Sequence, residues 1–126
     1  MGAVLIYDIT NAETFKNCKY WLENIRTYAN ENVVIALVAN KFDIVKQNAS
    51  KREVPMEAAE KFSRENGLIF VGETSALSNI YIKEVMSELI EKIYTVERES
   101  KQGKKSREKF RVTEEGEEGA KSGCCK

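Results

Sequence analysis

Three short apolar runs, each followed by a segment with helical periodicity, constrain the fold of this chain most strongly. The runs span residues 3–9, 33–39 and 68–71. Continuous apolar runs of this length are typical of strands buried on both faces, and strands that alternate with helices are typical of a parallel sheet. The sequence therefore predicts an α/β fold of three parallel strand–helix units.

The first predicted helix has its apolar residues in a stripe of 3.6-residue period. The stripe contains Phe15, Cys18, Leu22, Ile25 and Ala29, and Trp21 and Tyr28 are expected to widen it. Thr10 or Asn11 has the side-chain oxygen that caps a helix start. We therefore expect Cys18 to be a small buried hydrophobic residue rather than a reactive thiol.

Two further helices are expected, with a loop over residues 40–52 before them. One runs from about 55 to 66 and stops at Gly67, because glycine readily takes the left-handed conformation that ends a helix. The last begins near Asn79 and fades near Val96. Its apolar side consists of Ile82, Val85, Met86, Leu89, Ile90 and Ile93.

Length and charge limit the domain organisation. The chain of 126 residues holds one domain, predicted over residues 1–96, and residues 97–126 read as a flexible charged tail without apolar periodicity. The 20 basic and 20 acidic side chains cancel, so the chain lacks the electrostatic pattern of a nucleic-acid-binding protein. No apolar stretch approaches the roughly 20 residues of a membrane span.

Two polar loops follow directly after predicted strands. Asn40-Lys41-Phe42-Asp43 follows the second run, and Glu73-Thr74-Ser75-Ala76-Leu77 follows the third. In an open parallel sheet, ligands bind beyond the carboxyl ends of the strands. The Asp43 carboxylate can accept from the ring N–H and exocyclic amine of guanine, and the backbone N–H of Ala76 can donate to guanine O6. The Lys41 stem can lie along the base plane, and Asn40 can bridge the two loops.

Each loop taken alone has a plainer explanation. An N-K-x-D string fixes three positions and occurs by chance in roughly one or two chains per hundred of this size. Lys-Asp loops after strands are common, and Ser75-Ala76 can simply cap a helix. Because both strings occur in order, each at a predicted strand end, we interpret them together as a guanine-reading pair.

The chain resembles the second half of a Rab-type small GTPase of the Ras superfamily. The resemblance rests on residues 2–10, on Glu13-Thr14-Phe15 and Trp21-Leu22, and on the two loops. It implies that Asn40, Lys41 and Asp43 form the base-specificity loop, and that Ser75, Ala76 and Leu77 form the second base loop. The family usually has lysine where this chain has Leu77, so packing on the base is expected to be weaker.

The resemblance also implies what this chain lacks. No G-x-x-x-x-G-K-[ST] phosphate loop and no D-x-x-G string occurs in it. We therefore expect an incomplete P-loop NTPase (Ras-like) fold, without the switch regions. No catalytic residue and no metal ligand can be named, so GTP or GDP binding should be weak or absent in this chain alone, with Mg²⁺ bound only in a full-length parent. Whether the term enzyme applies stays open, although this chain alone is expected to be inactive.

The tail carries a basic stretch, then glutamates, and ends in Cys124-Cys125-Lys126. Taken alone, the charges fit a solvated tail. A C-a-a-X box would need cysteine at position 123, which is Gly123. Similarity to Rab proteins implies geranylgeranyl groups on Cys124 and Cys125, and two lipid chains give stable membrane anchoring. The expected location is cytoplasmic, at the cytosolic face of an intracellular membrane.

Two functional interpretations stay open. The first is a fragment of a Rab-like, GTP-binding regulator of vesicle-mediated membrane traffic. Its partners would be a guanine nucleotide, a membrane, a prenylation escort protein and trafficking effectors, but no nucleic acid. The second is a non-switching, lipid-anchored or partner-binding remnant without a nucleotide function. The subfamily, the membrane and the effector are left open by the sequence.

Overall fold

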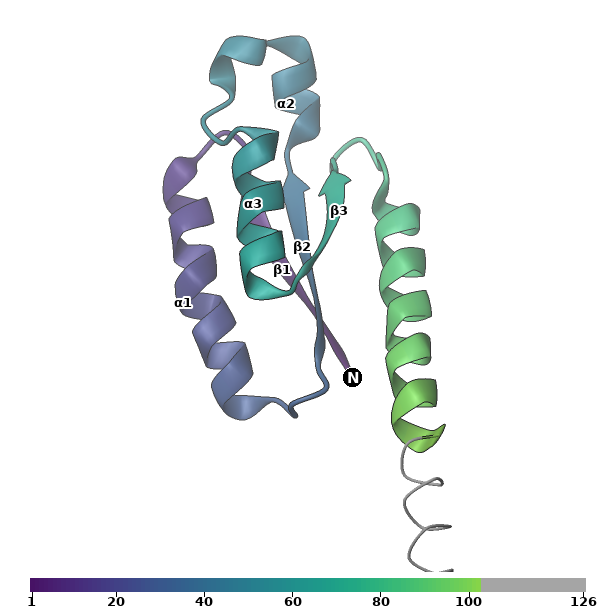
Figure 1. The fold of residues 1–126 in the computed structure, drawn as a ribbon. Coiled ribbons are helices and arrows are strands. Elements are labelled where there is room, and N and C mark those ends of the chain that lie inside the picture. The colour runs from purple at the N-terminus through teal and green to yellow at the C-terminus, as the bar shows by residue number, and fades with distance from the viewer. Residues whose placement is uncertain (103–126) are drawn as a thin grey trace, which may run out of the picture. The chain divides into compact units, whose positions relative to one another are not determined.

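The fold is a three-stranded parallel α/β sheet, taken from a computed structural model that describes residues 1–102. Figure 1 shows the elements in chain order. They are β1 (Gly2–Asp8), α1 (Ala12–Tyr28), β2 (Val34–Asn40), α2 (Phe42–Gln47), the 3-10 turn η1 (Ala49–Lys51), α3 (Met56–Asn66) and β3 (Ile69–Glu73). An unlabelled helix, here called the last helix, follows over residues 82–102. The predicted α/β class and parallel strand–helix order are confirmed.

Strand β2 is the centre of the sheet. It pairs with β1 in an unbroken register from Gly2–Val34 to Asp8–Asn40, and with β3 on its other side. Residues 34–39 are all buried, as expected for a strand covered on both faces. The pairing with β3 is interrupted between Leu37 and Val38. Gly72, at this irregularity, has a φ of 123°, which a side chain would strain.

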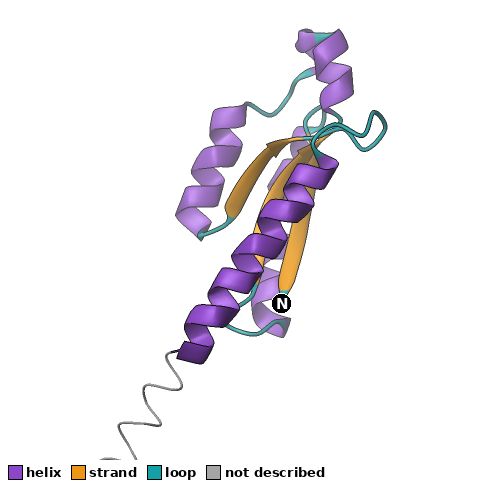
Figure 2. Cartoon of the chain, turned by 90° about the vertical axis from the view of Figure 1, so that its right-hand side faces the viewer, coloured by secondary structure: helices purple, strands orange, loops and turns teal. Residues whose placement is uncertain are grey.

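Alternate residues of the strands face two different layers. Leu5 and Tyr7 of β1 and Leu37 of β2 share one core with Cys18 and Leu22 of α1. Figures 1 and 2 show α1 and α3 on this side of the sheet. Within the unit formed by residues 1–93, the last helix covers the other side, where Val85 and Leu89 are buried. A second unit begins at Tyr94, so helical residues 94–102 are described only as helical.

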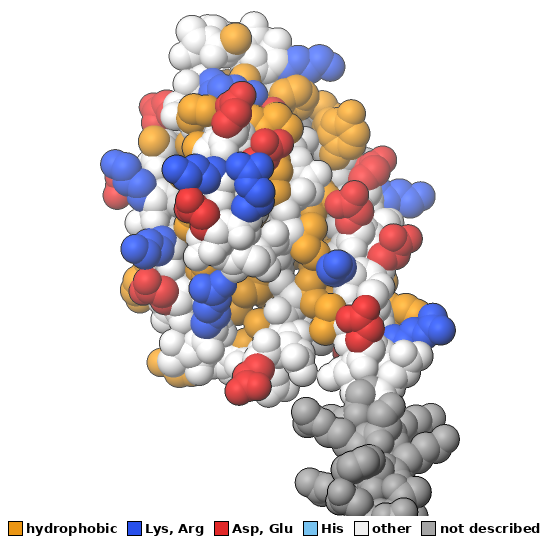
Figure 3. All heavy atoms as spheres, viewed as in Figure 1, with side chains coloured by type: hydrophobic (Ala, Val, Ile, Leu, Met, Phe, Trp, Pro, Cys, Tyr) orange, Lys and Arg blue, Asp and Glu red, His pale blue; other side chains and the backbone are white. Residues whose placement is uncertain are grey.

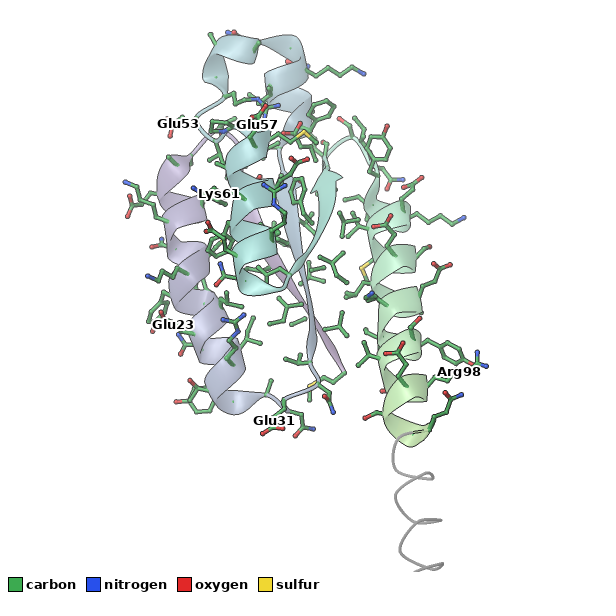
Figure 4. All side chains as sticks on the ribbon, viewed as in Figure 1. Glu23, Glu31, Glu53, Glu57, Lys61 and Arg98 are labelled. Carbon is green, nitrogen blue, oxygen red and sulfur yellow. The ribbon has the colours of Figure 1, made fainter. Side chains whose placement is uncertain are left out.

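Capping side chains fix the helix ends near the sheet. The Asn11 side chain accepts from the N–H of Glu13, so Asn11, not Thr10, caps α1. The Glu53 carboxylate, labelled in Figure 4, accepts the N–H of Ala12 at 2.8 Å. Helix α3 ends at Gly67, whose φ of 64° is left-handed as predicted. These contacts set where the chain enters and leaves the sheet layer.

The predicted loop over residues 40–52 is wrong in detail, because it contains α2 and η1. Val45 of α2 is buried, which shows that this short segment has an apolar side of its own. The last helix also departs from prediction, since it starts at residue 82 and continues past Val96 to at least residue 102. The charged residues past Val96 are good helix formers, so the helix continues there although the apolar stripe has ended.

Two burial predictions are wrong as well. Trp21 and Tyr28 are 56% and 86% exposed, because they lie beside the buried stripe of α1 rather than within it. The face of β1 opposite α1 is only partly covered, leaving Val4 at 37% and Ile6 at 59% exposure. Among residues 1–102, no helix combines the length and the apolar character that crossing a bilayer requires.

Candidate nucleotide-base site

The carboxyl ends of the three strands bring the two predicted loops together. Asp8 and Asn40 are paired in register at the ends of β1 and β2, and Ala39 pairs with Glu73 at the end of β3. Thr74 follows immediately. The loops at 40–43 and 74–77 are therefore neighbours in space, although about thirty residues separate them in sequence, which is the expected geometry for a ligand site in a parallel sheet.

Backbone hydrogen bonds join the two loops. The N–H and hydroxyl of Thr74 both donate to the carbonyl of Ala39, at 2.7 and 2.8 Å. The N–H of Phe42 donates to the Thr74 carbonyl at 2.9 Å. Thr74 is only 1% exposed, so these bonds are shielded from water. The two loops are fixed to one another before any side chain is considered.

Asn40 adds a side-chain bridge, as predicted. Its Oδ1 accepts from the backbone N–H of Ala76 at 3.0 Å. This is the same N–H that the sequence analysis assigned to guanine O6. The predicted O6 contact therefore requires that N–H to be shared with Asn40 or released by it, a competition the sequence did not reveal.

Asp43 lies in the first turn of α2, where its carboxylate is held by the second loop. The hydroxyl of Ser75 donates to Asp43 Oδ1 at 2.7 Å and accepts from the N–H of Ser78 at 3.0 Å. Ser75 is fully buried. Within the described residues, Asp43 Oδ2 makes no hydrogen bond, so it can accept a donor from a ligand.

Lys41 is positioned by an unusual backbone and by an ion pair. Its φ of 68° and ψ of 32° are left-handed, which is uncommon for lysine. Its Nζ lies 2.6 Å from Asp8 Oδ2. The other Asp8 oxygen accepts from the N–H and hydroxyl of Thr10, at 2.9 and 2.6 Å. The stem of Lys41 is thereby drawn toward the end of β1.

These contacts decide the charge state of Asp8. Burial alone would raise the pKa of the Asp8 carboxyl, but the hydrogen bonds from Lys41 and Thr10 outweigh it and lower that pKa. Asp8 and Thr10 were not among the predicted site residues. The available signal was the position of Asp8 at the end of an apolar strand, the same position that identified Asn40.

Leu77 stands apart from the other predicted residues. It is 88% exposed, and the turn after it closes through an antiparallel pairing of Ser75 with Ile80. Asn79 and Tyr81 in this turn have positive φ values. Of the six predicted base-site residues, Asn40 is hydrogen-bonded to Ala76 and Asp43 to Ser75. Lys41 is ion-paired with Asp8, and Leu77 is exposed.

A second polar contact supports the end of β3. Both terminal nitrogens of Arg52 donate to the two carboxylate oxygens of Glu73, and one also donates to the Val54 carbonyl at 3.2 Å. The hydrogen bonds to Glu73 raise the pKa of Arg52 further, although burial opposes them. This bidentate pair anchors the segment after η1 to the residue that precedes Thr74.

A separate hollow of about 220 Å³ lies at the other end of the strands. It is lined by Arg26, Asn30, Glu31, Val33, Ile35, Asn66, Gly67 and Leu68. An Arg26 nitrogen donates to the Asn66 carbonyl and so completes the last turn of α3. This contact joins α1 to α3. It gives Arg26 a structural role, so no ligand is needed to explain a charged side chain at this hollow.

The bonded set gathers hydrogen-bonding groups at the carboxyl ends of the strands. It offers a carboxylate oxygen, an amide and a backbone N–H at one sheet edge, which are the groups that read a base edge. Among residues 1–102, no group of three carboxylate, thiol or imidazole side chains is placed to hold a metal ion. The proposed lipidation residues, Cys124 and Cys125, lie outside the described residues. Cys18 is buried, and burial raises the pKa of its thiol to about 11.

Comparisons with known proteins agree with this arrangement. Residues 1–95 match the Ras family. The chain is 41% identical over 96 residues to "Ras-related protein Rab11A" of Lotus japonicus, and 42% identical over 94 residues to "Ras-related protein RABA4b" of Arabidopsis thaliana. These matches cover 76% and 75% of this chain but 40% of each relative, so the chain spans well under half of their length. On this evidence the chain belongs to the Ras family, with the sequence of a Rab-type small GTPase.

Proposed function

We propose that this chain carries the guanine-reading part of a Rab-type, GTP-binding regulator of vesicle-mediated membrane traffic. The observation that carries the proposal is the hydrogen-bonded set at the strand ends. Asp43 is aimed by Ser75, and Asn40 is bonded to Ala76 in the neighbouring loop. Similarity to Rab proteins over 96 residues supports the same reading.

The proposed discrimination follows from the acceptor-only chemistry of Asp43. A carboxylate accepts from the ring N–H and exocyclic amine of guanine at once, whereas adenine does not present that pair of donors. An unpaired carboxylate in a partly desolvated site costs about 1–3 kcal/mol. The site should therefore prefer guanine by one to two orders of magnitude in affinity.

Affinity in this chain should nevertheless be low. Base contacts alone supply roughly 3–4 kcal/mol, which corresponds to a dissociation constant near or above about 1 mM. Tight nucleotide binding and hydrolysis depend on groups that hold phosphate and Mg²⁺. Mg²⁺ binding, GTP hydrolysis and recognition of effectors are accordingly proposed for a full-length parent, and this chain is expected to show no turnover.

The test is a nuclear magnetic resonance titration with guanosine and adenosine monophosphates at millimolar concentration. We expect Mg²⁺-independent shifts at residues 40–43 and 74–77 with the guanine nucleotide, and weaker shifts with the adenine nucleotide. Asp43→Ala should abolish that preference, whereas Glu57→Ala, an exposed acid on α3, should preserve it. Equal response to both nucleotides would contradict the proposal and favour a remnant without nucleotide function.

The anchoring part of the proposal concerns Cys124 and Cys125. Adjacent terminal cysteines, a basic stretch upstream and similarity to Rab proteins support double prenylation, an escort protein as partner and a place on the cytosolic face of an intracellular membrane. Cys18 should stay unmodified because it is buried. Mass spectrometry after expression in a eukaryotic cell should find lipid on the terminal pair, and its absence from a full-length parent would contradict this part.

A further inference from the structure

We propose that Asn66 is a site of spontaneous deamidation, restrained by the hydrogen bond that Arg26 makes at the end of α3. Of the asparagines in the chain, only Asn66 is followed by glycine. Ring closure at an asparagine is fastest before glycine, because glycine has no side chain to hinder it. The groups involved lie where the end of α1 meets the end of α3, and the proposal does not depend on nucleotide binding.

The reaction needs only water as a co-reactant. The backbone nitrogen of Gly67 loses its proton to water and attacks the side-chain carbon Cγ of Asn66. The bond from Cγ to Nδ2 breaks, and the leaving nitrogen takes up a proton and departs as ammonia. Water then opens the resulting succinimide ring at either carbonyl. One side-chain amide and one water thus give ammonia and an aspartyl or isoaspartyl residue at this position.

The attacking nitrogen is weakly held and open to water. The N–H of Gly67 points to the carbonyls of Ser63 and Arg64, and the distance to the Arg64 oxygen is 3.5 Å. That distance exceeds the range of about 2.7–3.2 Å that such bonds favour. Gly67 is exposed, and no described atom beyond its chain neighbours lies within 4 Å of the position a Cβ would occupy. Asn66 also lines the hollow of about 220 Å³, so water can reach its amide.

Two hydrogen bonds hold the amide away from this nitrogen. Asn66 Nδ2 donates to the Phe62 carbonyl at 2.8 Å, which turns the side chain back toward the preceding turn of α3. An Arg26 nitrogen donates to the Asn66 carbonyl, which fixes the peptide group between Asn66 and Gly67. Asn66 is the last helical residue of α3, and ring closure requires its backbone to rotate out of the helical conformation. Both bonds must therefore break before the nitrogen can attack.

Arg26 acts on this reaction as a restraint. A guanidinium bonded to a carbonyl also makes the adjoining N–H more acidic, which by itself would favour attack. That effect is lost in the open state, because the rotation that permits ring closure moves the Asn66 carbonyl away from Arg26. The rate in the folded chain is accordingly set by how often the last turn of α3 opens.

The product would weaken the corner in which it forms. The carbonyl end of α3 is the negative end of the helix dipole, so a new carboxylate is unfavourable there. Glu31, labelled in Figure 4 in the turn between α1 and β2, lines the same hollow and adds a second negative charge. An isoaspartyl residue also lengthens the backbone between α3 and β3. Amide hydrogen exchange at residues 64–69 should therefore be faster in the deamidated chain.

The test is peptide mapping by mass spectrometry after incubation of the full chain at mildly alkaline pH. The native chain is compared with the same chain unfolded in guanidinium chloride, and the readout is the mass change from an amide to a carboxyl group. In the unfolded chain, we expect Asn66 to react fastest of all the asparagines. In the native chain the same site should react at least about tenfold more slowly, because it must wait for local opening.

Variants separate the hydrogen bond from the charge. Arg26→Gln should raise the native rate about two- to tenfold, since losing one hydrogen bond makes opening easier, and should leave the unfolded rate unchanged. Arg64→Gln is the matched control, because Arg64 is an exposed arginine in the last turn of α3. Figure 3 shows charges of both signs interspersed over α1 and α3, so this variant removes one charge among several and should keep the parent rate.

Asn66→Gln should abolish the modification at this position in both the native and the unfolded chain, because the longer side chain closes a ring far more slowly. Circular dichroism establishes first that each variant keeps its helical content. Equal rates in the native and unfolded parent chain, faster reaction at another asparagine, or equal acceleration by Arg26→Gln and Arg64→Gln would each overturn the proposal.

Discussion

The carboxyl end and the outer edge of strand β1 differ in how completely their polar groups are paired. At its carboxyl end, the Asp8 carboxylate is bonded to Lys41 and Thr10, and the neighbouring loops are bonded to one another. Along its outer edge, the backbone of Val4 and Ile6 has no partner within the described residues. One strand thus combines a hydrogen-bonded carboxyl end with outward backbone groups that have no hydrogen bond within residues 1–102. The candidate site is held by hydrogen bonds across the sheet, between the end of β2 and the loop after β3.

The largest expected effect comes from β2, to which the site is connected. Leu37 has no exposed surface, and Leu37→Ala should lower the free energy of unfolding by about 2–5 kcal/mol, because it leaves a cavity in the core that the sheet shares with α1. Chemical denaturation followed by circular dichroism measures this loss. Ile6→Ala, at an exposed position on β1, is the comparison variant.

If the comparison is right, Ile6→Ala should change the stability of a single chain by less than about 0.5 kcal/mol, since surface substitutions usually have small effects. A loss from Ile6→Ala as large as that from Leu37→Ala would mean that the Ile6 side chain is buried in solution.

A smaller effect is expected from the link between the two loops. Ser75→Ala removes the hydroxyl that donates to Asp43 and accepts from Ser78 N–H. Because Ser75 is fully buried, the loss should cost about 1–3 kcal/mol. Amide hydrogen exchange should accelerate at residues 74–80 while β2 stays protected. Uniform acceleration across the sheet would show that the loops are not a separate unit.

The smallest expected effect is a pH dependence at the end of β1. The pKa of Asp8 is lower in the folded chain than in the unfolded chain, so ionised Asp8 stabilises the fold. This contribution is fully present above the unfolded pKa of about 3.9 and is lost as pH falls through the folded pKa. Urea midpoints measured between pH 7 and pH 2.5 should decline in that window.

Two variants test the source of that decline. Asp8→Asn should remove the contribution of the Asp8 carboxyl to the pH dependence of stability. Lys41→Met removes the ion-pair partner, and should make the pH-dependent contribution smaller by bringing the folded pKa of Asp8 closer to the unfolded value. If the urea midpoint of both variants falls at low pH as much as that of the parent chain, the Asp8–Lys41 pair does not stabilise the fold in solution.

Much of the fold was predictable because the apolar periodicity of each element and the residues that end it agree with one another. The apolar runs gave the three strands, Gly67 marked the end of α3, and the stripe with Cys18 and Leu22 gave the buried face of α1. Trp21 and Tyr28 were misassigned because a helical stripe has no sharp edge in sequence. Their exposure depends on which flank of α1 meets a neighbour, which is a property of the whole fold.

The nearness of the two predicted loops could be predicted from the sequence, but the hydrogen bonds between them could not. Asn40 and Asp43 were placed by their position after a strand. The ion pair of Lys41 with Asp8 and the use of the Ala76 N–H by Asn40 depend on distances between loops far apart in sequence. Leu77 shows the converse, since its departure from the family pattern was visible but its 88% exposure was not.

The parallel register of β2 has a consequence for the time course of folding. Its partners in β1 and β3 are each about thirty residues away in sequence, and no hairpin connects any two strands, so every ladder closes a long loop before it gains contacts. Neither half of the sheet can nucleate alone in microseconds. We expect helices α1 and α3 to form early and transiently, with the central strand ordered last and in a single concerted step.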